Sequence, residues 1–226
     1  MEGRDALRSA RALTRRLAGA ENGASPAARA LESFYALIDE LMQLPPPGRD
    51  AARLRLLGRF EVERAVLALD MADFSLSVRR SGILPHLCRI RRVQRLAAPL
   101  ITAAGGELVK CEADNVLAVF PQPRDAVAAA IAIRAAIAAA PADAEDDSPL
   151  KAGIGIDFGR FLLIPGRDAF GDAVNVAHKL GEDLARAGEI LVTAEAARRL
   201  GADAGVRLEP LSFSISGLEL QAFRVT

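Results

Sequence analysis

A short turn between two apolar strands is the feature that most narrows the folds open to this chain. Residues 106–112 and 115–121 have the pattern of β-strands, and only the turn Glu112-Ala113-Asp114-Asn115 separates them. Strands joined so closely must pair as an antiparallel hairpin. The hairpin therefore argues for a sheet with antiparallel pairing rather than for a strict alternation of strands and helices.

The remaining periodicity extends this sheet. We expect further strands at 62–70, 150–157, 159–165, 188–193, 206–213 and 219–225. We expect a long helix or helix pair at 75–103, and helices at 124–140, 171–186 and 194–200. Because helices are interspersed among the strands, the pattern predicts an α+β domain with a mainly antiparallel central sheet flanked by helices.

The first 60 residues are expected to form an N-terminal helical extension to a domain that spans 61–226. In the stretch PAARALESFYALIDELMQL, apolar side chains recur at helical spacing, and three prolines and a glycine at 45–48 end that helix. A second short helix is expected at about 51–57. Two roles stay open for the extension, a packing appendage or a helix that mediates dimerisation or transmits a signal.

Charge and cysteine content exclude several classes of protein. Lysine plus arginine and aspartate plus glutamate number 29 each, so no electrostatic attraction to nucleic acid or to a membrane surface is expected. Cys88 and Cys111 are the only cysteines, too few for a disulfide framework or a zinc cluster. The apolar run 126–140 contains Arg134 and is too short to span a bilayer. We expect a cytoplasmic protein without a transmembrane segment.

Two aspartates stand where strands end. Asp70 follows the apolar residues 65–69, and Asp114 lies in the hairpin turn. If the first strand lies beside the hairpin, the two carboxylates occupy neighbouring strand ends, where they would repel each other unless a cation joined them. Oxygen ligands without nearby histidine or cysteine suit a hard ion such as Mg²⁺ or Mn²⁺. Taken singly, Asp114 could be an ordinary turn residue and Asp70 a helix cap.

From about Val62 to the C-terminus, the chain resembles the catalytic domain of class III nucleotidyl cyclases, the adenylyl and guanylyl cyclase family. The first motif comprises Asp70, Met71, Ala72, Asp73, Phe74 and Ser75. The second runs from Lys110 to Asp114. The third contains Asp168, Gly171, Asn175 and Lys179. The stretches GEILVT and FSISGLELQAFRV resemble the closing strands of that domain. The resemblance implies the ferredoxin-like class III cyclase fold.

The resemblance also implies an activity and its cofactors. Members of the family close a nucleoside triphosphate into a 3′,5′-cyclic nucleotide when the ribose 3′-hydroxyl attacks the α-phosphate and pyrophosphate leaves. For this chain we expect an adenylate cyclase that converts ATP to 3′,5′-cyclic AMP. Two Mg²⁺ or Mn²⁺ ions per site would be bound by Asp70 and Asp114, with the carbonyl of Met71 as an extra ligand. Backbone amides around Asp73, Phe74 and Ser75 would hold the β- and γ-phosphates.

Other residues are assigned by the same resemblance. Asn175 would position the ribose, and Lys179 would face the α-phosphate as charge develops there. Lys110 and Asp168 would read adenine through a ring nitrogen and the exocyclic amine. Because metal-binding and base-reading residues of one site come from different chains in this family, a head-to-tail homodimer is implied.

Departures from the family pattern keep alternatives open. Lys179 stands where arginine is usual, and Ala113 and Asn115 flank Asp114 where glycines are usual. Ser216 stands in the place where a lysine is common. The chain could instead be a guanylate or pyrimidine nucleotide cyclase, or a degenerate cyclase domain that acts as a nucleotide-binding or signalling module. For His86 and His178 we expect ordinary structural or surface roles.

Overall fold

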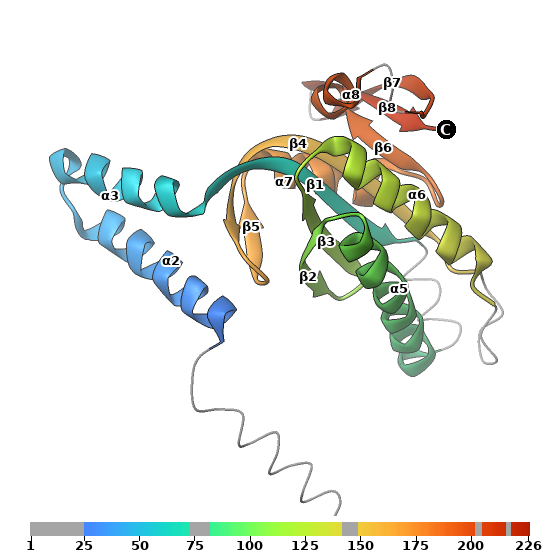
Figure 1. The fold of residues 1–226 in the computed structure, drawn as a ribbon, viewed down its shortest axis with the longest axis horizontal. Coiled ribbons are helices and arrows are strands. Elements are labelled where there is room, and N and C mark those ends of the chain that lie inside the picture. The colour runs from blue at the N-terminus through green and yellow to red at the C-terminus, as the bar shows by residue number, and fades with distance from the viewer. Residues whose placement is uncertain (1–24, 73–81, 142–148, 202–204, 216–217) are drawn as a thin grey trace, which may run out of the picture.

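The computed structural model describes residues 25–72, 82–141, 149–201, 205–215 and 218–226 (Figure 1). The helical elements are α2 (Pro26–Gln43), α3 (Pro46–Phe60), α5 (Ile83–Ala103), α6 (Pro123–Ala139), α7 (Asp172–His178), the π-helix η1 (Lys179–Leu184) and α8 (Ala194–Leu200). The strands are β1 (Glu61–Met71), β2 (Glu107–Glu112), β3 (Asn115–Phe120), β4 (Ala152–Ile164), β5 (Asp168–Phe170), β6 (Ile190–Thr193), β7 (Leu208–Ile215) and β8 (Leu218–Val225).

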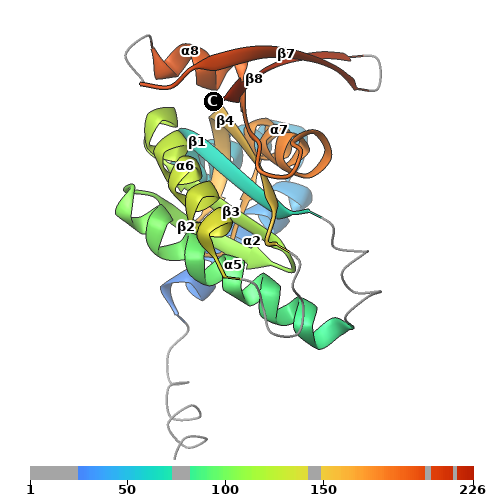
Figure 2. The ribbon, with the colours of Figure 1, turned by 90° about the vertical axis from the view of Figure 1, so that its right-hand side faces the viewer.

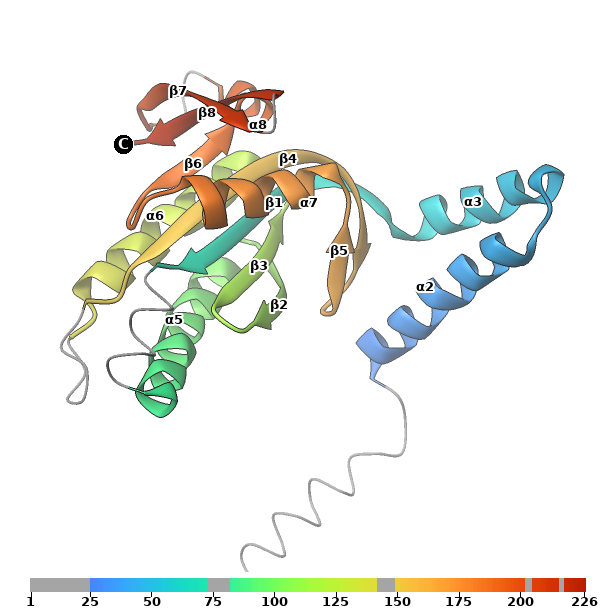
Figure 3. The same cartoon turned by 180° about the vertical axis from the view of Figure 1, so that it is seen from behind.

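The strands form one mixed sheet in the order β2-β3-β1-β4-β6-β8-β7, with β5 paired to β4. In the described residues, β4 and β6 pair in parallel, and the other neighbouring strands pair antiparallel. The succession β1-α5-β2-β3-α6-β4 gives the spatial order β4-β1-β3-β2, which is the ferredoxin-like arrangement (Figure 3). The predicted α+β class and its mainly antiparallel sheet are therefore confirmed.

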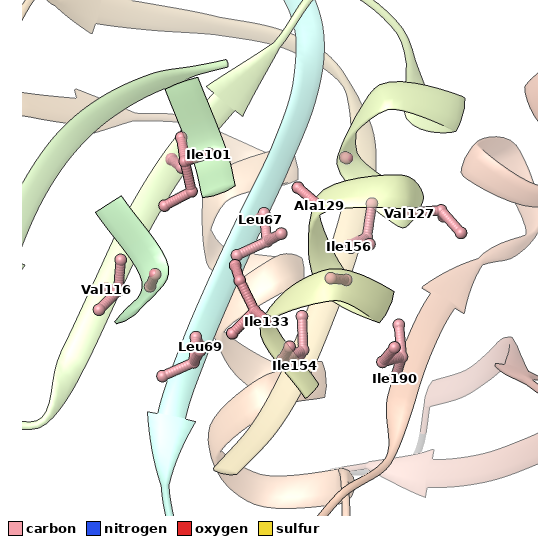
Figure 4. Packing of buried hydrophobic residues seen from close by; sticks show 14 of the residues in the cluster. Leu67, Leu69, Ile101, Val116, Val127, Ala129, Ile133, Ile154, Ile156 and Ile190 are labelled. Atoms are coloured by element: carbon pink, nitrogen blue, oxygen red, sulfur yellow. The ribbon is translucent and has the colours of Figure 1, made fainter. Parts of the chain in front are cut away.

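Helices cover both faces of the sheet, α5 and α6 on one side and α7 on the other (Figure 2). Along β1, Leu67 and Leu69 point to the side where Ile133 of α6 packs (Figure 4). Val66 and Ala68 point to the opposite side and belong to the cluster under α7. Since both faces of β1 are buried, its residues from 65 to 69 are all apolar.

The helices α2 and α3 form a pair that projects from the sheet and leads directly into β1 (Figures 1 and 3). The Phe34 ring meets the Phe60 ring edge-on with 5.2 Å between centroids, and it stacks on Phe170 at 5.6 Å. The predicted first helix is confirmed. The second begins at Pro46 rather than near residue 51, because the first turn of a helix needs no backbone N–H and so accepts proline.

Two boundaries were predicted wrongly. The expected strands 150–157 and 159–165 are one strand, β4, in which Gly159 pairs with Arg64 of β1 and the pairing continues on both sides. The expected helix 171–186 is the short helix α7 followed by the π-helix η1, which ends at Leu184. Of the expected helix or helix pair at 75–103, α5 forms the part from Ile83, and residues 73–81 lie outside the described residues.

Candidate active site

The ends of β1 and of the β2–β3 hairpin bring Asp70 and the turn residue Asp114 to the same edge of the sheet. β1 pairs with β3 in antiparallel register up to the pair Leu69 with Val116, and Asp70 is the next residue along β1. Asp114 lies in the two-residue turn before β3, preceded by Ala113 at a positive φ of 48°. The first strand thus lies beside the hairpin, as the sequence argument required.

Burial and acidic neighbours raise the pKa of Asp70 from 3.8 to about 7. Burial of the carboxyl group is the largest cause, and the negative charges of Asp114, Glu182 and Asp183 act in the same direction. A hydrogen bond from the Met71 backbone opposes the shift. The carboxylate form of Asp70 is therefore disfavoured until a cation offsets these charges.

The donor atoms at this edge fit a hard divalent cation. Asp70 and Asp114 offer carboxylate oxygens, and Met71 offers a backbone carbonyl, whereas its side chain is buried. Across the described residues, no group of three or more histidine, cysteine, aspartate or glutamate side chains is arranged as a metal site. The roles of Asp70, Met71 and Asp114 as ligands remain predictions. Asp73, Phe74 and Ser75 lie outside the described residues.

Lys110 and Asp168, assigned to base recognition, are in direct contact. The Nζ of Lys110 lies 3.0 Å from Oδ1 of Asp168 on β5 and 3.0 Å from Oε2 of Glu112. A register shift between Leu108 and Lys110 marks a bulge in β2, a feature that redirects a side chain. Burial lowers the pKa of Lys110, but hydrogen bonds to Asp168 and Glu112 outweigh it, and the pKa is raised. Lys110 therefore remains a cation.

Asn175 and Lys179 lie four residues apart on the helix formed by α7 and η1. Asn175 is exposed on α7, and Lys179 is the first residue of η1, where its Nζ lies 2.5 Å from Oδ2 of Asp183. The hydrogen bond of 2.7 Å from the Ala185 amide to the Leu180 carbonyl has the spacing of a π-helix. Within the described part of the chain, neither Asn175 nor Lys179 forms a hydrogen bond or ion pair with Asp70 or Asp114.

Two glycines hold this helix against the sheet. A Cβ on Gly155 of β4 would lie 2.1 Å from the Ala177 carbonyl oxygen, and a Cβ on Gly181 would lie 2.7 Å from the Ala68 carbonyl oxygen. The backbones approach so closely that no side chain fits between them. This contact places the acidic residues of η1 near the end of β1.

Sequence reasoning missed the acidic residues of η1 and a partner for one histidine. Glu182 Oε1 lies 2.8 Å from Nδ1 of His178. With the Asn115 amide oriented to suit its neighbours, its nitrogen donates to the same oxygen at 3.1 Å and to the Leu69 carbonyl at 3.3 Å. The available signal was spacing, because Glu182 follows His178 by four residues and Asn175 by seven. The other histidine, His86, is buried, which agrees with a structural role.

Comparisons with known proteins place this fold. No family model matches the chain. The putative adenylate cyclase 3 of Rhizobium meliloti (strain 1021) is 31% identical over 129 residues, which cover 57% of this chain and 22% of that protein. The match thus spans about a fifth of the length of that curated relative.

None of the helices in the described residues has the length and apolar character that a membrane span requires.

Two solved structures cover most of the chain. The adenylate/guanylate cyclase/hydrolase from Silicibacter pomeroyi superposes with a TM-score of 0.61 at 28% identity, over 74% of this chain and 97% of that chain. The catalytic core of a rhodopsin-guanylyl cyclase with converted specificity, in complex with ATPalphaS, gives 0.65 at 21% identity, over 74% and 97%. The fold is that of nucleotidyl cyclase catalytic domains. The comparisons thus confirm the predicted fold and the resemblance of this chain to class III nucleotidyl cyclase catalytic domains.

Proposed function

We propose that this domain is an adenylate cyclase that converts ATP to 3′,5′-cyclic AMP and pyrophosphate. The observation that carries the proposal is the placement of Asp70 and Asp114 at adjacent strand ends, where burial and then the charge of Asp114 raise the pKa of Asp70. Two carboxylates held together in a partly buried position suit the divalent ions that accompany a triphosphate.

In the reaction, the ribose 3′-oxygen forms a bond to the α-phosphorus, its proton is released, and the bond from that phosphorus to the bridging oxygen of pyrophosphate breaks. Asp70 and Asp114 would hold two Mg²⁺ or Mn²⁺ ions. Such ions, when bound, lower the pKa of the attacking hydroxyl and offset the charge on the phosphates. Asn175 would orient the ribose, and Lys179 would stabilise the charge that develops on the α-phosphate. An intramolecular attack requires mainly this positioning.

The choice of adenine rests on the contact between Lys110 and Asp168. The ammonium group of Lys110 donates hydrogen bonds, and the Asp168 carboxylate accepts them. Adenine presents a ring nitrogen that accepts and an amine that donates, so this pair matches its edge. Guanine presents the reverse order at the corresponding atoms.

The proposed sites are shared by a head-to-tail homodimer. We assign Asp70 and Asp114 to one half-site and Asn175 and Lys179 to the other, because the metal-binding and base-reading residues of one site come from different chains in the family that the motifs resemble. A second copy related by a two-fold axis would bring each half-site against its complement. Two equivalent sites would result.

Incubation of the purified protein with each of the four ribonucleoside triphosphates and Mn²⁺, followed by mass identification of products, tests the proposal. Cyclic AMP from ATP alone is the expected result. Cyclic GMP or a cyclic pyrimidine nucleotide as the main product would reject the assignment of Lys110 and Asp168 to adenine.

One observation favours a second function, a domain that binds a nucleotide and signals without turnover. Lys179, where the family generally has arginine, is held by Asp183 on the same helix. A paired lysine is less available to the α-phosphate than a free cation. Absence of any cyclic product, together with measurable binding of ATP in the presence of Mn²⁺, would favour this function.

A further inference from the structure

A cavity of about 180 Å³ lies between the β2–β3 hairpin and the helix formed by α7 and η1. Lys110, Asn115 and Leu117 line it from the hairpin, and His178 and Glu182 line it from the helix. A cavity of ~150 Å³ holds benzene, so this one has room for a flat ring of similar size. Lys110, which contacts Asp168, forms part of its wall.

The ring of His178 is held in one orientation. Its side chain is 25% exposed, and Nδ1 lies 2.8 Å from Oε1 of Glu182. The amide nitrogen of Asn115 donates to the same oxygen, which anchors Glu182 to the hairpin. Because an ionised carboxylate can only accept hydrogen bonds, Nδ1 carries the hydrogen in this contact. In the neutral ring, Nε2 is then an acceptor.

An acceptor on the wall of the cavity that Lys110 also lines would complete the recognition of an amine. The exocyclic amine of adenine has two N–H groups, and the carboxylate of Asp168, which contacts Lys110, would accept one of them. Nε2 of His178 can accept the other, while Lys110 donates to the ring nitrogen. Hypoxanthine and guanine carry a carbonyl oxygen at this position, which would face acceptors and leave them without a donor.

We propose that His178, oriented by Glu182, determines base specificity by accepting a hydrogen bond from the exocyclic amine of the bound nucleotide. The inference rests on the proposed function, since it places the base in the cavity beside Lys110. It adds a residue that the cyclase resemblance does not assign, and it makes Glu182 a positioning residue.

The test measures binding rather than turnover. The full chain is titrated in Mn²⁺ with the triphosphates of 3′-deoxyadenosine and 3′-deoxyinosine, which lack the attacking hydroxyl and differ at the amine position. The wild type should prefer the adenine nucleotide. His178→Ala should lower that preference about fivefold to tenfold, as expected for one hydrogen bond, with little change for the inosine nucleotide. His178→Gln, which retains an acceptor, should restore most of the preference.

Glu182→Ala is a second test variant in case His178→Ala fails to fold. It should also lower the preference for the adenine nucleotide, because the His178 ring loses its orientation. Arg186→Ala, an exposed position just after η1, is the matched control and should leave the preference unchanged. A preference that is unaltered in both alanine variants would overturn the inference, as would a wild type that does not distinguish the two nucleotides.

The binding readout separates this inference from the proposed function. If the wild type makes no cyclic product but His178→Ala still loses its preference for the amine, the cyclase proposal fails and the role of His178 stands. If cyclic AMP is formed and the preference is unaffected by His178→Ala, the cyclase proposal stands and the role of His178 is rejected.

Discussion

Lys110 and Asp168 meet in an ion pair of 3.0 Å between the short strand β5 and the hairpin strand β2. The two residues belong to different motifs of the sequence, and β5 reaches its position by pairing with the far end of β4. The pair therefore depends on the fold of the whole sheet. It is also the feature on which the choice of adenine depends.

Removal of either partner should weaken the recognition of adenine. Lys110→Ala or Asp168→Ala should lower kcat/KM for ATP about 10- to 100-fold, the range for a hydrogen bond to a charged group. Much of the loss should appear in KM. The control is Glu112→Gln, which alters the other partner of Lys110, an exposed residue at the end of β2. Steady-state kinetics with ATP and GTP would make the comparison, and an undiminished preference for ATP in both alanine variants would reject the assignment.

The raised pKa of Asp70 predicts how stability depends on pH without metal. A carboxyl group with a pKa of about 7 in the folded state and 3.8 in the unfolded state binds more protons when folded. The free energy of unfolding should therefore fall as the pH rises from about 4 to about 7, and remain low above that. Because Asp70 is only half buried, we expect the effect to be modest.

Thermal unfolding in EDTA measures this dependence. At pH 8, Asp70→Asn should raise Tm by about 3 °C, since it removes a charge among like charges, and at pH 5 the difference should shrink. Mn²⁺ should raise Tm of the wild type at pH 8 but not of Asp70→Asn. The exposed Asp50 provides the control substitution Asp50→Asn. Equal changes in Tm for Asp70→Asn at both pH values would show that the surroundings do not raise the pKa of Asp70.

Lys179 distinguishes an enzyme from a binding module. If it faces the α-phosphate in the transition state, Lys179→Ala should lower kcat about 10²- to 10³-fold with little change in KM. Lys179→Arg should retain most of the activity, because a cation remains and guanidinium binds phosphate well. Asp183→Asn, which releases Lys179 from its ion pair, should not lower kcat. A parallel loss of nucleotide affinity in Lys179→Ala would indicate ground-state binding instead.

The contact between η1 and the sheet should be sensitive to one methyl group. Gly155→Ala would place a Cβ 2.1 Å from the Ala177 carbonyl oxygen, so the helix must shift. We expect a loss of about 3 kcal/mol in the free energy of unfolding. The control is Gly58→Ala in α3, where an added Cβ has nothing within 4 Å and should stabilise the helix by up to about 1 kcal/mol. Chemical denaturation of both variants would compare them, and similar stabilities would contradict the close packing.

Much of the fold followed from local patterns in the sequence. The turn at Ala113 and Asp114 dictated the hairpin, and the apolar run before Asp70 marked the central strand. The expected interruption at residue 158 is wrong, because Phe158 and Gly159 continue the pairing with Ala65 and Arg64 of β1. The expected start of α3 near residue 51 is too late, because prolines that follow one helix also suit the first turn of the next.

The candidate site was predictable where a motif named its residues, and less so where the fold created the contact. The sequence placed Asp70 and Asp114 at strand ends, and the register of β1 with β3 brought those ends together. Glu182 was not singled out, because an acidic residue on a helix is ordinarily exposed to solvent. Its position next to Asn115 results from the π-helical turn and the close approach of Gly181 to β1.

Mixing two inactive variants tests the central claim most directly. Asp70→Asn disables one half-site and Asn175→Ala the other, so each homodimer should make almost no cyclic AMP. A mixed dimer retains one intact site, and random pairing of equal amounts should restore about a quarter of the wild-type activity. Recovery near that level would confirm that Asp70 and Asn175 serve one shared site. No recovery at any mixing ratio, with subunit exchange verified, would contradict the account.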